Sequence, residues 1–105
     1  MSLIQESRSR DEEILSCVER GLDKVGPGVK KYVYWHIQKR SHVERDDILT
    51  KPALFVQGLQ SIYHESSIAV QNSIVEEINS TFDLSHSPAQ LAEAITRARK
   101  SAQSK

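Results

Sequence analysis

The sequence has a single cysteine and no long apolar run, and each of these absences excludes a class of protein. Cys17 is the only cysteine among 105 residues, so the chain cannot form a disulfide within itself. No stretch approaches the roughly 18 consecutive apolar residues that a membrane-spanning helix needs. The opening MSLIQESRSRDEE has no apolar segment after its basic residues, unlike a secretory signal. We therefore predict a cytoplasmic protein that does not enter the membrane.

Motifs of catalysis and of cofactor binding are also missing. The four histidines are scattered, and without paired cysteines or an HExxH motif they do not match a zinc site. The turn Gly26-Pro27-Gly28 lacks the spacing and the following Lys-Ser/Thr of a phosphate-binding loop. Cys17 lies among apolar neighbours, where a buried and unreactive thiol is expected. We predict a non-enzymatic protein with no catalytic residue, cofactor or metal and no evident small-molecule substrate.

Strand patterns are absent as well, whereas apolar residues recur at spacings of three and four, which indicates amphipathic helices. Helices are predicted for residues 11–25, 29–40, 52–62 and 68–82, and a last helix begins at the capping box Ser87-Pro88-Ala89-Gln90. The predicted fold class is all-α, a compact four-helix core with an additional C-terminal helix. Residues 1–10 are predicted to be a flexible arm, 11–84 the helical core domain, and 85–105 the C-terminal helix and basic tail.

Several positions carry finer expectations. The turn Gly26-Pro27-Gly28 ends the first helix, and Ile48 and Leu49 are expected to tuck a short turn under the core. Gly58 interrupts the third helix, which suggests close packing against a neighbour. The exposed face of the fourth helix is expected to hold the polar residues Gln71, Asn72, Glu76, Asn79 and Ser80.

The stretch KKYVYWHIQKR, residues 30–40, contains the only tryptophan. Projected at 100° per residue, the helix groups Val29, Val33, His36 and Ile37 on a core side. His36 is then expected to be a hydrogen-bonded histidine at the edge of the core. Trp35 falls near the opposite face, with Lys31 and Lys39 four residues to either side. An exposed tryptophan beside lysine stems is a good anchor for a protein partner.

The last helix offers a second candidate surface through Leu91 and Ile95, its only large apolar residues. Three arrangements are open: the helix docks on its own chain, it exchanges into a homodimer, or it lies across Trp35 in the same chain.

Charge is unevenly distributed along a chain whose formal net charge is zero. Bases gather in residues 30–45 and after residue 96, whereas residues 52–96 hold acids and no lysine or arginine. The alternative function is therefore a nucleic-acid-binding regulator. Its candidate contacts are Lys30, Lys31, Trp35, Lys39, Arg40, Arg97, Arg99 and Lys100.

Residues 12–84 resemble the small archaeal domain family called the Nitrosopumilus output domain. The likeness lies in the order of features: Tyr34-Trp35 before a basic helix end, then DDILTKPALFVQGLQSIY, then SIVEEINSTFDL. The resemblance implies an all-helical output or interaction module of archaeal signalling proteins, with no catalytic residues to carry over. The predicted function is thus a regulatory or adaptor domain that binds a protein, or itself, through Lys31, Trp35, Lys39, Leu91 and Ile95.

Overall fold

Two antiparallel helices, α1 (Leu3–Val25) and α4 (Ser67–Phe82), form the most extensive helix contact among the described elements. The computed structural model describes residues 3–82 and 91–103, with side chains for residues 10–82 and 91–99. Gly21 lies where the two helices approach closely, since an added Cβ would meet the Ile74 Cγ1 at 2.6 Å and its Cα at 2.7 Å. The Ser73 hydroxyl donates a hydrogen bond of 2.9 Å to the Gly21 carbonyl at the same place.

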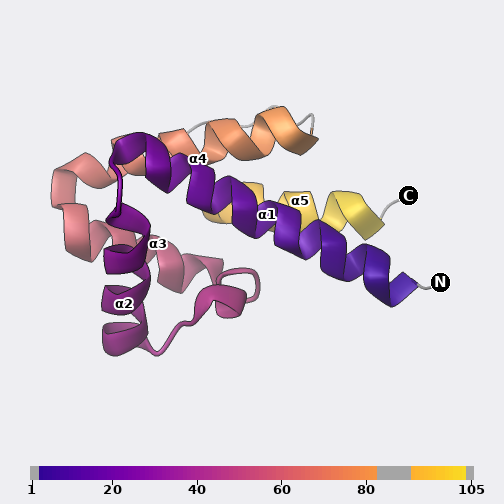
Figure 1. Cartoon of the computed structure of the whole chain (residues 1–105), viewed down its shortest axis with the longest axis horizontal. Helices are drawn as coiled ribbons and strands as arrows, with labels where there is room; N and C mark the ends of the chain where they lie inside the picture. The colour runs from indigo at the N-terminus through magenta and orange to yellow at the C-terminus, as the bar shows by residue number, and fades with distance from the viewer. Residues whose placement is uncertain (1–2, 83–90, 104–105) are drawn as a thin grey trace.

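Helices α2 (Val29–Ser41) and α3 (Pro52–Tyr63) pack against each other beside this pair (Figure 1). The turn between α1 and α2 needs Gly28, whose φ of 82° is costly for other residues. Pro52 begins α3 at a first-turn position, as predicted. The predicted close packing at Gly58 is confirmed, because an added Cβ would lie 2.5 Å from the Cγ1 of Ile37.

Two short 3-10 turns connect the helices. The first, η1 (Arg45–Ile48), is capped by reciprocal hydrogen bonds between Glu44 and Asp47, and the second is η2 (His64–Ser66). Ile48 and Leu49 are both buried. The predicted turn under the core is therefore confirmed.

Helix α5 (Leu91–Gln103) lies behind α1 in Figure 1 and packs on α4, α3 and α1. Four of its side chains are buried in the same core as those of the other helices. They are Leu91, Ala94, Ile95 and Ala98. The all-α prediction is confirmed, and the C-terminal helix is an integral layer of the hydrophobic core.

Three expectations differ from the structure or lie outside it. Helix α1 begins at Leu3, two turns before the predicted start at Asp11, so the backbone of residues 3–10 is helical. Gln71 is 5% exposed, because α4 is covered on several sides and Gln71 donates a hydrogen bond to the Ser67 hydroxyl inside that contact. The predicted capping box at residues 87–90 lies outside the described residues.

No helix among the described residues is long and apolar enough to span a bilayer.

Candidate functional site

The outward face of α2 carries the most exposed aromatic side chains of the described residues. Trp35 is 57% exposed and Tyr32 is 52% exposed, and their ring centroids lie 6.4 Å apart. The Lys39 ammonium sits 5.4 Å from the centroid of the Trp35 ring, a cation–π contact. The predicted exposure of Trp35 between lysines is therefore confirmed. We call Lys31, Tyr32, Trp35, Lys39 and Arg40 the basic face.

The basic face has positive charge without local compensation. Helix α2 contains no acidic residue. Lys31, Lys39 and Arg40 are exposed, and none of them forms an ion pair with another residue that the structure describes. Lys30 lies instead 3.9 Å from the Glu19 carboxylate of α1, so it is turned partly toward the body of the protein.

The opposite side of α2 is fixed to α1 through Glu19. The Tyr34 hydroxyl donates to the Glu19 Oε2 at 3.1 Å, and the Arg45 Nε donates to the same oxygen at 2.7 Å. Burial by itself raises the pKa of the Glu19 carboxyl, but hydrogen bonds from Arg45 and Tyr34 outweigh it and hold that pKa below its ordinary value. Burial, with the adjacent Glu19 charge, raises the pKa of the Tyr34 phenol. These contacts orient α2 so that Trp35 points outward.

His36 lies beside the aromatic pair, with its ring centroid 5.8 Å from that of Tyr32. Its Nε2 is buried and has no hydrogen-bond partner in the described part of the chain. The expected hydrogen-bonded histidine is thus not observed at this nitrogen, although the polar residues Gln57 and Ser61 of α3 line the same small pocket as His36.

The candidate residues of α5 are placed differently from those of α2. Leu91 and Ile95 are 1% and 0% exposed, because they fill the core of their own chain. Of the three predicted arrangements, the structure therefore has the helix docked on its own chain. Helix α5 does not cover Trp35, since it packs on α1, α3 and α4.

Two arginines of α5, Arg97 and Arg99, form ion pairs with acidic neighbours. Arg97 pairs with Glu93 one turn earlier at 3.5 Å. The Arg99 Nε lies 3.5 Å from Asp11 of α1, and its Nη1 donates to the Leu49 carbonyl at 3.3 Å. The side chain of Lys100 lies outside the described residues. Figure 1 shows α2 and α5 apart from each other, so the two groups of predicted nucleic-acid contacts do not form one surface.

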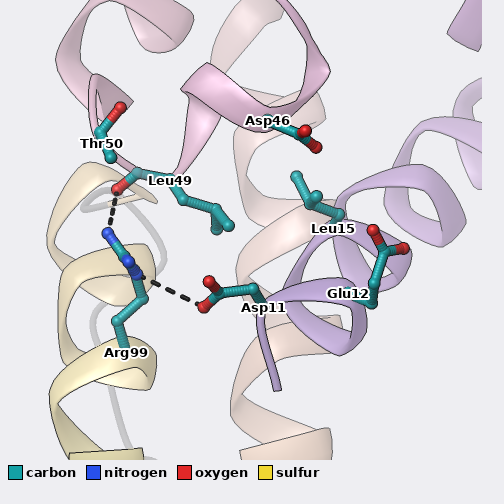
Figure 2. Close-up of a pocket in the computed structure, with 7 residues that line it drawn as sticks. All are labelled: Asp11, Glu12, Leu15, Asp46, Leu49, Thr50 and Arg99. Carbon is teal, nitrogen blue, oxygen red and sulfur yellow. Dashed lines mark hydrogen bonds and ion pairs between the residues drawn. The ribbon is translucent and has the colours of Figure 1, made fainter. Parts of the chain in front are cut away.

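A cleft of about 400 Å³ lies between α1, η1 and α5, and Figure 2 shows Arg99 reaching across it. Its lining residues are Asp11, Glu12, Leu15, Asp46, Leu49, Thr50 and Arg99. Sequence reasoning missed this cleft because its residues come from segments that are far apart in the chain. Arg99 pairs with Asp11, and Arg45 pairs with Glu12 at 3.1 Å. Both carboxylates therefore already have arginine partners. These ion pairs join α1 to α5 and to η1.

Two further groups bear on reactivity. Cys17 is fully buried as predicted, and burial raises the pKa of its thiol, which disfavours the reactive thiolate. Among the described residues, no three His, Cys, Asp or Glu side chains are arranged to hold a metal ion.

Comparison of the chain with protein-family models, with curated proteins and with solved structures gave no match.

Proposed function

We propose that this chain is a non-enzymatic, cytoplasmic regulatory or adaptor domain that binds a protein through the basic face of α2. The observation that carries the proposal is the exposure of Trp35 and Tyr32 side by side among uncompensated cations. Large aromatic side chains supply much of the energy of protein interfaces, and lysine stems extend the apolar area beside them. The resemblance to an archaeal output domain leads to the same kind of function.

Leu91 and Ile95 have no part in the proposed surface, since both are buried within their own chain. The interaction depends instead on Lys31, Trp35 and Lys39, with Tyr32 added by its contact with Trp35. Glu19 of α1 accepts hydrogen bonds from Tyr34 of α2 and from Arg45, which fix the orientation of α2. The basic face is therefore ordered before binding, and little conformational entropy is lost when a partner docks on it.

The alternative, nucleic-acid binding, retains one supporting observation. Trp35 lies between two exposed lysines and could stack on an unpaired base. The separate placement of Arg97 and Arg99 leaves few cations on that surface, and each neutralised phosphate requires one. We therefore rank protein binding first.

Photo-cross-linking in living cells of the source organism tests the proposal. A photoreactive phenylalanine analogue replaces Trp35, and a matched variant carries it at Ala53, an exposed position of α3. We expect protein adducts at position 35 that are missing from position 53. Adducts to nucleic acid alone, or equal adducts at both positions, would contradict the proposal.

A further inference from the structure

The two most exposed large apolar side chains of the described residues lie in surroundings of opposite charge. Ile68 at the start of α4 is 59% exposed, and Trp35 on α2 is 57% exposed. Trp35 is surrounded by cations, whereas Ile68 lies between Glu65 and Glu76 in a stretch without lysine or arginine. This inference rests on the proposed function and concerns the partner of the basic face.

The basic face cannot pair with its own copy. Helix α2 contains four bases and no acid, so two such helices placed together would bring like charges into contact. Stacking of one Trp35 on another would therefore work against the repulsion of Lys31 and Lys39. The surface that fits this face must carry carboxylates next to an apolar side chain.

A surface of that kind exists elsewhere on the same chain. Glu65, Ile68 and Glu76 are all exposed along η2 and α4, and we call these three residues the acidic face. The nearby Glu77 is not part of it, since Lys24 and Arg20 pair with its carboxylate at 2.7 and 2.9 Å. Neither Glu65 nor Glu76 forms an ion pair with another described residue, although Glu76 contributes to the raised pKa of Lys24.

We propose that the basic face of one copy docks on the acidic face of a second copy. Trp35 would then cover Ile68, while Lys31 and Lys39 approach the two carboxylates. The lysines are eight residues apart on α2, about 12 Å along a helix, with Trp35 midway between them. Ile68 also lies between the two carboxylates along the chain, three residues after Glu65 and eight before Glu76. One contact covers both exposed apolar residues and compensates both charged faces, which suits a chain of zero net charge.

Figure 1 shows α2 and α4 on different parts of the molecule. The contact therefore joins two different surfaces of the chain, which is a heterologous interface. Such a contact builds a ring where the rotation closes and an open chain where it does not.

Sedimentation velocity of the full chain over a wide concentration range tests this proposal. We expect reversible association that weakens as salt is added, because the contact depends on exposed charges. Lys31→Glu with Lys39→Glu, and separately Glu65→Lys with Glu76→Lys, should each weaken association roughly tenfold or more. Mixing the two variants should restore it, because each α2 face then meets a complementary α4 face.

A matched control reverses two exposed carboxylates of α1 that lie outside the acidic face, Glu13→Lys with Asp23→Lys. It should associate like the natural chain, and circular dichroism should show all three variants equally helical. A natural chain that stays monomeric, or variant mixtures that fail to associate, would overturn the proposal. If position 35 nevertheless cross-links to a different protein, only the second copy is ruled out as partner. The absence of any protein adduct would contradict the proposed function as well.

Discussion

Gly21 controls how closely α1 and α4 can approach. A Cβ at this position would lie 2.7 Å from the backbone Cα of Ile74, and backbone cannot move aside as a side chain can. Gly21→Ala should therefore lower the free energy of unfolding by about 2 kcal/mol through overpacking, even though alanine favours the helix. The urea midpoint at neutral pH, followed by circular dichroism, measures this change.

Gly58→Ala is the matched comparison. Its Cβ would meet side-chain atoms of Ile37, the nearest at 2.5 Å, and a side chain can repack where backbone cannot. The loss of stability should thus be smaller than for Gly21→Ala. An equal or larger loss at Gly58 would show that the α1–α4 backbone contact is not the tighter constraint.

Single residues also show which features of the site the sequence could predict. The exposure of Trp35 and the burial of Val33 and Ile37 follow from helical periodicity, and all three were predicted correctly. The burial of Gln71 could not be predicted from a pattern that treats every amide as exposed, because it depends on how many neighbours cover α4. The missing hydrogen-bond partner of the buried His36 Nε2, among the described residues, likewise depends on tertiary contacts that helical periodicity does not specify.

At the scale of elements, Glu19 links α1 to α2 and to η1. Its folded pKa is held below its ordinary value, chiefly by hydrogen bonds from Arg45 and Tyr34 that overcome the effect of burial. The contribution of Glu19 to stability is therefore fully present above an unfolded pKa of about 4.3, and it is lost as the pH falls through the lower folded pKa. Glu19→Gln should cost about 1 kcal/mol at neutral pH.

Urea unfolding of Glu19→Gln and the natural chain between neutral pH and pH values below about 4 tests this linkage. The difference between the two proteins should shrink as the pH falls. Glu13→Gln is a suitable control, since Glu13 is exposed and makes no ion pair with the described residues. A difference that stays constant with pH would mean that Glu19 contributes by packing alone.

Helix α5 is the element whose role the sequence understated. Ile95 is fully buried, so Ile95→Ala should lower the free energy of unfolding by about 2–5 kcal/mol. Thr96→Ala, at an exposed position one residue away, should change it little. If thermal unfolding shows both variants equally stable, α5 does not belong to the cooperative core.

The helices were largely predictable, since their ends are marked by local chemistry such as Gly28 and Pro52. The first two turns of α1 were not, because residues 3–10 lack the apolar repeat of the rest of the helix. The docking of α5 was left open because Ala94 and Ala98 bury little area and give a weak signal, although both pack fully. The links from Arg45 and Arg99 to α1 join residues far apart in sequence, and no local pattern predicts them.

At the scale of the whole molecule, basic and acidic residues lie on different elements although the formal net charge is zero. Cations gather on α2, and the stretch from Pro52 to Phe82 contains carboxylates without a lysine or arginine. Figure 1 shows α2 and α4 as separate helices, and among the described residues no ion pair joins Lys31 or Lys39 to Glu65 or Glu76. Contact between copies brings the two faces together, and Trp35 lies at the proposed contact.

The emission of Trp35, the only tryptophan, tests this contact most directly. The natural chain is held at low concentration and titrated with the Trp35→Phe variant, which keeps the acidic face but emits no tryptophan signal. We expect a red-shifted emission that moves to the blue until it saturates, and that reverts as salt is added. An emission that stays unchanged with the variant but shifts with single-stranded DNA would contradict the contact between copies and favour nucleic-acid binding.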